Sequence, residues 1–529
     1  MRLPIAVERL SAMVDNPNPQ ENDLNLPSKY EEIKRDLVRT AIKQPLLKMI
    51  LDEKHKEPLP VILEANDEYY LGKEKAVEQI RKLVEAVGVT EWISIGSDQN
   101  PYYKATLTRK QILDIVAKDD DNAQKRTSDV EDKAVGEVQK AAMPQQVGRY
   151  LAIRRIWYNH PINPLIDKSV GTVKADAAQR AFLADGKDIV WAVIDSGIDG
   201  NHDHFKARHT LNVELPVRHW DFTNPSTDPA KNSPSALVDK FGHGSHVAGI
   251  IAGAYIAGND FPVAKAERTK LGDDNQVDTF SETLTQIAGM APSCKVVSLK
   301  VLNDSGEGDV SNIIAAIDYI QQINNYGRNV KIHGVNLSVG YEFDPLWFAC
   351  GQTPVCVEVN RLVRAGVVVV VAAGNTGYGV LNANQRATGA GFMLTINDPG
   401  NADLAITVGS THRDAPYTYG VSYFSSKGPT GDGRMKPDLV APGERILSCR
   451  STNKQGTNGT NTYVEDSGTS MAAPHVSGVI AAFLSIRREY IGSPDKVKQL
   501  FLSTASDLGR NNYFQGKGLV DLMRAIQSI

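Results

Sequence analysis

Residues 366–373 read GVVVVVAA, an uncharged and almost wholly apolar run. A membrane span needs about 20 such residues, so we interpret this shorter run as a buried β-strand. A helix predicted over 310–323 places Ile313, Ile317 and Ile320 on one face, as a helix covering a sheet should. Strands that are apolar on both faces belong to a parallel sheet with helices on both sides. The fold class is therefore α/β, a doubly wound parallel sheet, and four more strands are expected at Ile189–Ile194, Lys295–Leu302, His333–Val339 and Leu404–Gly409.

Sites in such a sheet lie at the carboxyl ends of the strands. Asp195, in IVWAVIDSGID, follows the first strand at that edge. Taken alone, an aspartate after a strand more often forms a turn or caps a helix.

Two histidines, His243 and His246, stand in FGHGSHVAGIIAG just ahead of a helix rich in small residues. They could bind a metal if a third ligand came from elsewhere, or they could make ordinary hydrogen bonds. Gly242, Gly244 and Gly249 favour a special role, because glycines let the backbone pack closely around an imidazole.

Ser470, in DSGTSMAAPHVSG, is expected to open a helix whose buried stripe includes Val476, Val479 and Phe483. A serine at a helix start is usually a cap. Free backbone N–H groups and the positive end of the helix dipole would also favour an oxyanion beside this hydroxyl.

Together these segments resemble the subtilisin-like serine proteases, or subtilases. The matching motifs IDSGID, HGSHVAG, NLSVG, VVVVAAGN and GTSMAAPHVSG follow one another in the family's order between about residues 173 and 525. The order Asp, His, Ser is that of subtilisin. The resemblance implies hydrolysis of peptide bonds, with Ser470 as nucleophile, His243 as base, Asp195 orienting His243, and Asn375 helping to bind the oxyanion.

The resemblance also implies how a protein or peptide substrate binds, by strand addition to exposed edges. The expected substrate-binding residues form two edges and a primary pocket: Gly306, Glu307 and Gly308; Leu337, Ser338, Val339 and Gly340; and Ala372, Ala373 and Gly374. Glu307 could favour basic residues in the substrate, or it could belong to an ordinary solvated acidic loop.

Two segments depart from compact subtilases. A polar insertion lies between Ala254 and Met290, and a longer segment over 341–356 could wall off the cleft. His204 stands where many members place a calcium-ligating aspartate, so calcium cannot simply be carried over. Asp203 is adjacent to His204. The chemistry requires no cofactor; a structural calcium is an open alternative that Asp273, Asp274 and Asp278 could bind, although acidic loops without a metal are commoner.

The N-terminal third has a different pattern. We expect a helical extension over 1–56, a small α+β, ferredoxin-like domain over 57–165, and the catalytic domain over 166–529. Strands at Pro60–Asn66, Trp92–Ile95, Tyr103–Thr108 and Tyr150–Trp157 would flank helices at Lys73–Gly88 and Arg109–Ala117, and 119–146 is interpreted as an insertion or linker.

This order resembles the subtilase propeptide, which would make the chain a zymogen. Residues 57–165 would then inhibit the enzyme intramolecularly, and autocleavage by Ser470 would fall within 158–168. A retained regulatory or recognition domain is the alternative.

Composition excludes other classes. The formal net charge is −4 and no basic block stands out, so nucleic acid is not an expected partner. No apolar run approaches a membrane span, and Glu8 and Arg9 interrupt any signal-peptide core, so we expect a cytoplasmic protein unless a leader has been removed. Cys350 and Cys356 could pair in an oxidising compartment, whereas cytosolic thiols stay reduced.

Three hypotheses remain at this stage. The first is a serine endopeptidase, the second a non-catalytic or gated scaffold whose N-terminal domain recognises a partner, and the third a peptide ligase that passes the acyl group to an amine. An intact set of Asp195, His243, Ser470 and Asn375 favours the endopeptidase, and nothing in the sequence favours the ligase.

Overall fold

The computed structural model describes residues 41–43, 46–51, 57–89, 91–94, 101–131, 147–158, 169–258, 263–271, 277–343, 349–383, 386–453 and 462–529. The chain divides into two compact units, Met1–Ile162 and Asn163–Ile529, which are described separately below.

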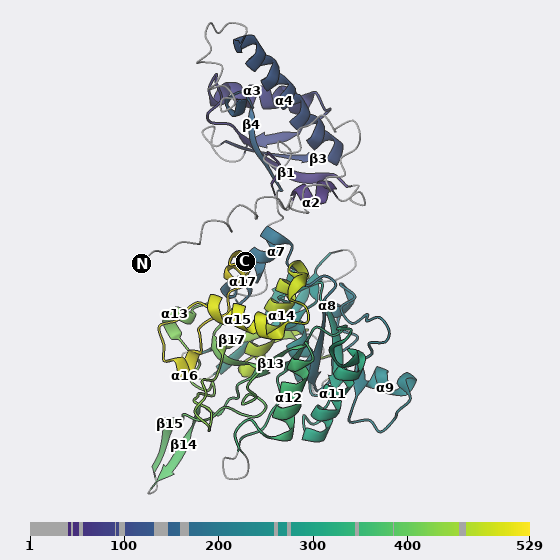
Figure 1. The fold of residues 1–529 in the computed structure, drawn as a ribbon, viewed down its shortest axis with the longest axis vertical. Helices are drawn as coiled ribbons and strands as arrows, with labels where there is room; N and C mark the ends of the chain where they lie inside the picture. Colours follow the sequence, from purple (N-terminus) through teal and green to yellow (C-terminus); the bar gives the residue numbers. More distant parts are fainter. Residues whose placement is uncertain are drawn as a thin grey trace, which may run out of the picture. The chain divides into compact units, whose positions relative to one another are not determined.

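The described residues of the first unit form one four-stranded sheet and two long helices (Figure 1). Its strand order is β2-β3-β1-β4, and all three pairings are antiparallel. This is the predicted ferredoxin-like arrangement, in which two βαβ crossovers interleave. The elements are β1 (Leu59–Ala65), α3 (Lys73–Glu85), β2 (Trp92–Ser94), β3 (Tyr102–Leu107), α4 (Arg109–Glu131) and β4 (Ile153–Tyr158).

Helix α4 corrects one sequence prediction, because it runs on to Glu131 instead of ending near Ala117. No glycine or proline interrupts Arg109–Glu131, so nothing in the chain ends the helix earlier. The charged residues that suggested a linker are partly buried: the Asp119 carboxylate accepts hydrogen bonds from the backbone N–H groups of Ala152 (3.2 Å) and Ile153 (2.9 Å). Burial raises the pKa of Asp119 to about 6.

A short helix from the predicted extension shares this unit's core. In α2 (Leu46–Leu51) the side chains of Leu46 and Ile50 are fully buried among residues of β1, α3 and β4. The rest of the 1–56 segment, apart from residues 41–43, lies outside the described residues.

A parallel sheet of seven strands forms the centre of the second unit. Its order is β17-β16-β13-β12-β5-β11-β6, and every pairing is parallel. The strands are β5 (Val190–Asp195), β6 (Trp220–Asp221), β11 (Lys295–Lys300), β12 (Gly334–Leu337), β13 (Val368–Ala372), β16 (Ile406–His412) and β17 (Leu439–Glu444).

Alternate residues of β5 show why both faces of the sheet are covered. Trp191 and Val193 belong to one core cluster, whereas Ala192 and Ile194 belong to another on the opposite face. Successive side chains of a strand point to opposite faces, so an apolar strand of this kind must be buried on both. The doubly wound architecture predicted from the sequence is confirmed.

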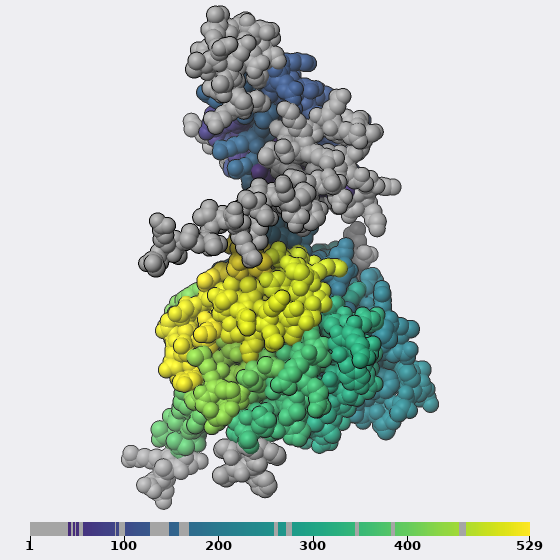
Figure 2. Space-filling model, in the orientation of Figure 1, coloured from purple at the N-terminus to yellow at the C-terminus, as the bar shows by residue number. Residues whose placement is uncertain are grey.

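The covering helices divide between these two cores (Figure 1). The first core receives α7 (Ala175–Phe182), α10 (His243–Ile251), α14 (Thr469–Ile486), α15 (Pro494–Thr504) and α17 (Leu522–Gln527). The second receives α11 (Val310–Ile323), at the bounds expected from its isoleucine pattern, and α12 (Pro354–Arg364). In the space-filling view, the C-terminal residues in yellow form one continuous part of this unit's surface (Figure 2).

Helix α14 is central to this core. It is long and apolar enough to span a membrane by length and composition, but 83% of its residues are buried within the unit. That is the position of a core helix.

Smaller elements surround the main sheet. A second sheet has the order β18-β19-β8-β9, and two further sheets have two strands each, β7 with β10 and β14 with β15. Their bounds are β7 (Ala254–Ile256), β8 (Ala264–Leu271), β9 (Val277–Leu284), β10 (Gln286–Ala288), β14 (Tyr378–Ala383), β15 (Arg386–Gly391), β18 (Ile446–Cys449) and β19 (Tyr463–Asp466); short helices are α6 (Ser169–Thr172), α8 (Asp203–Lys206), α9 (Pro229–Ser235), α13 (Pro416–Tyr419) and α16 (Asn512–Gln515).

All four cysteines of the chain are buried free thiols. The Cys350–Cys356 bridge considered from the sequence is therefore not formed in this structure.

Candidate active site

Asp195 and His243 meet at the carboxyl edge of the main sheet. Asp195 is the last residue of β5 and His243 the first residue of α10. The His243 Nδ1 atom lies 2.8 Å from Asp195 Oδ1 and 3.0 Å from Oδ2. The carboxylate is 1% exposed and the imidazole 19% exposed. The aspartate is thus buried behind a histidine whose ring still reaches solvent.

Glycine at position 244 makes this approach possible. A Cβ atom on Gly244 would lie 2.1 Å from the carbonyl oxygen of Gly197 and 3.2 Å from the Cβ of Asp195. Any side chain there would therefore push α10 away from the end of β5. This close approach is the tight backbone packing around the imidazole that was expected from the glycines.

A second buried carboxylate, which the sequence analysis did not single out, holds the start of α10. Asp239 accepts hydrogen bonds from Ser196 Oγ (2.9 Å), Gly242 N (2.7 Å) and both the N–H (2.8 Å) and hydroxyl (2.6 Å) of Ser245. Free N–H groups at a helix start favour such an anion. Asp239 could have been identified from the sequence, because it lies three residues before Gly242 and just ahead of the predicted helix start.

Electrostatics favour the protonated form of His243. Burial alone would lower its pKa, but the charge and hydrogen bond of Asp195 raise it, with smaller contributions from Asp466 and Asp239. The net effect raises the pKa of His243 to about 9.

Ser470 lies in the first turn of α14 and is held by the segment after β12. Its hydroxyl donates to the Ser338 carbonyl (3.0 Å), and the Ser338 hydroxyl donates to the Ser470 carbonyl (2.9 Å). The Asn336 amide in turn donates to Ser338 Oγ at 2.8 Å. In the resting arrangement Ser470 Oγ bonds to Ser338 rather than to His243, all of which the structure describes. Rotation of one side chain would redirect this hydroxyl, as is common before substrate binds.

The amide of Asn375 is fixed in one orientation. Its Oδ1 accepts hydrogen bonds from the N–H (2.9 Å) and hydroxyl (3.0 Å) of Thr469. The NH₂ group is therefore directed away from Thr469, and Nδ2 lies 3.2 Å from where a Cβ on Gly468 would be. Gly468 thus leaves room beside an amide donor next to the nucleophile.

These residues share one cavity of about 370 Å³. Of the catalytic candidates, His243, Ser470 and Asn375 line it, while Asp195 lies behind His243. The predicted substrate-binding residues that line it are Gly306, Ser338, Val339, Gly340, Ala372 and Gly374.

Other predicted substrate-binding residues do not line the cavity. Leu337 and Ala373 are fully buried, and Glu307 and Gly308 are exposed beside it. The carboxylate of Asp304, three residues before Glu307, lies 2.7 Å from Lys240 and 3.2 Å from Lys300. Part of the acidic charge around Glu307 is therefore neutralised.

Five lining residues were not anticipated: Phe241, Leu302, Thr376, Asn397 and Thr469. Phe241 had a signal, since it directly precedes the GHGSH motif. Asn397 had none, because it reaches the cavity from 22 residues beyond Asn375.

The metal interpretation of the two histidines finds no support in the geometry. Nε2 of His246 lies 3.1 Å from the carbonyl oxygens of both Ile446 and Val464, and it is buried. Among the residues that the structure describes, no group of three or more His, Cys, Asp or Glu side chains could hold a metal ion.

The calcium position of the family is also built differently. Ring nitrogens of the buried His204 lie 3.2 Å from the Tyr463 hydroxyl and 3.2 Å from the Ala252 carbonyl. Burial lowers the pKa of His204 to about 3. A neutral imidazole packed among aromatic rings does not fit a calcium site, which requires oxygen ligands. Asp273 and Asp274 lie outside the described residues.

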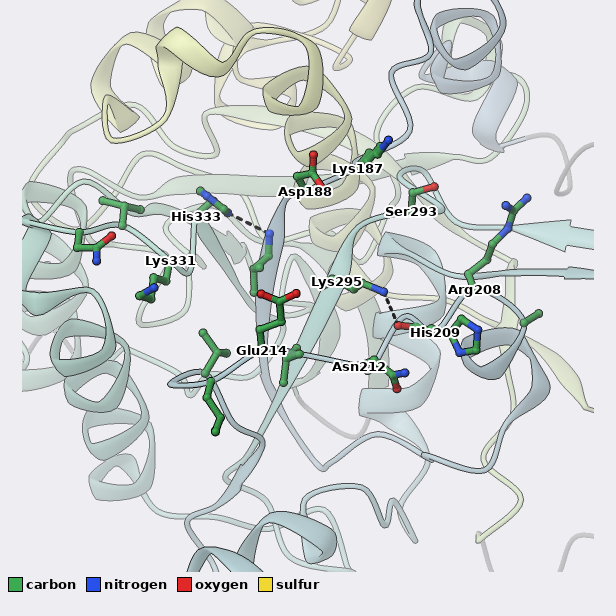
Figure 3. A pocket seen from close by; sticks show the side chains of 17 residues that line it. Lys187, Asp188, Arg208, His209, Asn212, Glu214, Ser293, Lys295, Lys331 and His333 are labelled. Atoms are coloured by element: carbon green, nitrogen blue, oxygen red, sulfur yellow. Dashed lines mark hydrogen bonds between the residues drawn. The ribbon is translucent and has the colours of Figure 1, made fainter. Parts of the chain in front are cut away.

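A larger cavity, of about 820 Å³, lies at the opposite edge of the sheet (Figure 3). It is lined by residues that begin strands, among them Val190 of β5 and Lys295 of β11, so it faces the amino ends. Lys295 Nζ donates to the His209 carbonyl at 2.7 Å, as the dashed line in Figure 3 shows. None of the triad candidates lines it.

An aspartate, a histidine and a serine in this chain order, at the carboxyl edge of a parallel sheet, define a subtilisin-type serine protease. Residues 186–518 match the model of the subtilase family. Serine protease AprX of Bacillus subtilis (strain 168) is 28% identical over 375 residues, covering 69% of this chain and 72% of that relative.

Two further relatives are subtilisins. Subtilisin DY of Bacillus licheniformis is 28% identical over 355 residues, or 67% of this chain and 96% of the relative. The subtilisin of Bacillus pumilus is 30% identical over 358 residues, or 68% of this chain and 98% of the relative. The chain belongs to the subtilase family, and it is a serine endopeptidase that acts on proteins or peptides.

Proposed function

We propose that Ser470 is the nucleophile of this endopeptidase, that His243 is its general base, and that Asp195 holds the His243 tautomer. The observation that carries the assignment is the buried Asp195–His243 hydrogen bond in a site that Ser470 shares. Because Nδ1 bonds to Asp195, Nε2 is the atom left to take the Ser470 proton.

The reaction follows from these positions. The Ser470 oxygen attacks the peptide carbonyl while His243 accepts its proton, and Asp195 stabilises the resulting imidazolium. His243 then protonates the leaving amine. Water next attacks the acyl group while His243 accepts a proton from it, and His243 returns that proton to the Ser470 oxygen as the acid product leaves. The carbonyl oxygen carries negative charge in between.

That charge needs donors already in place. The Asn375 NH₂ is one, since Thr469 fixes its orientation. The backbone N–H of Ser470 is the other, because the first N–H groups of a helix have no partner within the helix. Backbone of the 306–308 and 337–340 segments would pair with the substrate on either side.

We propose further that residues 57–165 inhibit this site intramolecularly until Ser470 cuts within 158–168. The support is the ferredoxin-like strand order β2-β3-β1-β4 of the first unit, which resembles the subtilase propeptide. A retained recognition domain is the competing role for the same unit.

The masses of purified wild type and Ser470→Ala separate these roles. Self-processing predicts a wild type shortened by about 160 residues beside a full-length Ser470→Ala. Ser503→Ala, which changes an exposed serine of α15, is the matched control and should be shortened like wild type. Two full-length proteins with normal peptidase activity would contradict self-processing and favour a retained domain.

A further inference from the structure

A two-stranded ribbon rises from the wall of the catalytic cavity. Strands β14 and β15 pair with each other and with no other described strand, and they project from the body of the second unit (Figure 1). The segment they belong to, 377–396, begins after Thr376 and ends before Asn397, and both of these residues line the cavity. Thr376 Oγ1 and Asn397 Oδ1 lie 3.1 Å apart, so the two ends of the segment meet there.

The base of the ribbon is held rigidly. Gly377 N donates to the Phe424 carbonyl (3.0 Å), and Lys427 Nζ donates to the Gly377 carbonyl (2.9 Å). A Cβ on Gly377 would lie 2.0 Å from the Ser425 carbonyl oxygen. These contacts anchor the first residue of the segment two positions after Asn375.

Apolar side chains of segment 377–396, together with Tyr423 beside it, face solvent. We call them the ribbon patch: Tyr378 (46% exposed), Val380 (60%), Leu381 (52%), Met393 (41%), Leu394 (60%) and Tyr423 (68%). Tyr378 and Tyr423 pack edge to face, with ring centroids 5.5 Å apart. Tyr378 Oη also occupies the place where a Cβ on Gly389 would stand, so small residues of β15 leave the aromatic rings uncovered.

Charge is nearly absent from this surface. Between Gly377 and Leu394 the single charged residue is Arg386. Because Val380 and Leu381 are neighbours on β14, they lie on opposite faces, and both faces are apolar. A two-stranded ribbon gains little stability on its own, and contiguous exposed apolar groups mark interaction sites.

We propose that the ribbon patch is an extended substrate-binding surface, which takes uncharged apolar segments of a polypeptide whose scissile bond lies in the cavity. The occupant follows from continuity: segment 377–396, which carries most of the patch, is flanked by Thr376 and Asn397, and both of these residues line the cavity. A polypeptide that extends out of the cavity past these residues would therefore contact the patch. Long unfolded polypeptides would reach it, and peptides of four residues would not. The inference rests on the proposed catalytic site.

The test compares a long and a short substrate with the variant Val380→Ser/Leu381→Ser. Both side chains are more than half exposed, so the fold should not change. We expect kcat/KM for unfolded casein to fall about tenfold, mainly through KM, because truncating well-packed apolar contacts typically costs binding of that order. Hydrolysis of a tetrapeptide p-nitroanilide should change less than twofold.

A matched control is Leu215→Ser, which removes a 70% exposed leucine at the opposite edge of the sheet. It should leave both substrates unaffected. Equal losses for casein and tetrapeptide in the ribbon variant, or no loss for casein, would overturn the inference.

Binding without chemistry separates this inference from the catalytic assignment. In a Ser470→Ala background, fluorescence anisotropy should show about tenfold weaker binding of labelled casein to the ribbon variant. If that difference persists while wild type cleaves neither substrate, the catalytic assignment fails and the ribbon patch stands. A wild-type dimer that the variant dissolves, or a variant with raised tetrapeptide activity, would instead assign the patch to a second copy or to the N-terminal unit, and would overturn the inference.

Discussion

The two edges of the main sheet carry cavities of opposite character. The carboxyl edge has the smaller one, about 370 Å³, with His243, Ser470 and Asn375 in its wall. At the amino edge lies a cavity of about 820 Å³ with more charged residues, including Lys187, Arg208, Lys295 and Lys331. Judged by volume and charge alone, the cavity at the amino edge would have been taken as the functional site.

Helix direction explains why the chemistry is at the first edge. Both α10 and α14 begin there, at His243 and Thr469, so the positive ends of both helix dipoles face the site. Such ends stabilise a developing oxyanion. The position of the protease site therefore depends on hydrogen-bond donors directed at the developing oxyanion more than on the volume of the cavity.

Among substitutions that compare the two edges, Asn375→Ala should lower kcat the most. Loss of one oxyanion donor lowers kcat by about 10²–10³-fold in related enzymes, and KM should change little because the donor acts mainly in the transition state. Steady-state hydrolysis of a tetrapeptide measures both constants. Lys295→Ala, at the amino edge, should change kcat less than twofold; an effect as large as that of Asn375→Ala would show that the edges are not functionally distinct.

A smaller change, a shift of the pH profile of kcat/KM, is expected when the charge around His243 is altered. His243 must be neutral to act as base, and its pKa is raised to about 9. The acid limb of kcat/KM should therefore fall tenfold per unit below about pH 9, instead of below the ordinary value of about 6.5. Asp466→Asn removes one charge that raises this pKa, so it should move the limb to lower pH.

The same shift affects stability in the opposite direction. Because the folded-state pKa lies above the unfolded one, the contribution of His243 to stability is complete below about pH 6.5 and is lost as pH rises through about 9. An acid limb centred near 6.5 and unmoved in Asp466→Asn would contradict the electrostatic account.

Predictions from the sequence were correct where a local pattern of residues determines which side chains are buried. The apolar run at 366–373 and the isoleucine spacing at 310–323 required burial on both faces of a sheet and on one face of a helix, and the structure has both. The neighbourhood of Asp195, His243 and Ser470 followed from strand ends and helix starts.

Long-range contacts escaped prediction. Asn397 reaches the cavity only because the ribbon returns to its base, and no local pattern marks that closure. Helix α4 was predicted too short because the polar stretch after Ala117 suggested solvent, whereas Asp119 is buried against β4. The outer strand β17 was missed because its sequence, LVAPGE, carries a proline and a glycine at the sheet edge.

The most direct test of the central claim is labelling with a fluorophosphonate probe, followed by mass mapping of the adduct. Such a probe reacts with a serine only when a base activates its hydroxyl. We predict labelling of wild type at Ser470, with none in Ser470→Ala and strongly reduced labelling in His243→Ala. An adduct on another residue, or equal labelling of Ser470→Ala, would contradict the assignment of Ser470 as the nucleophile.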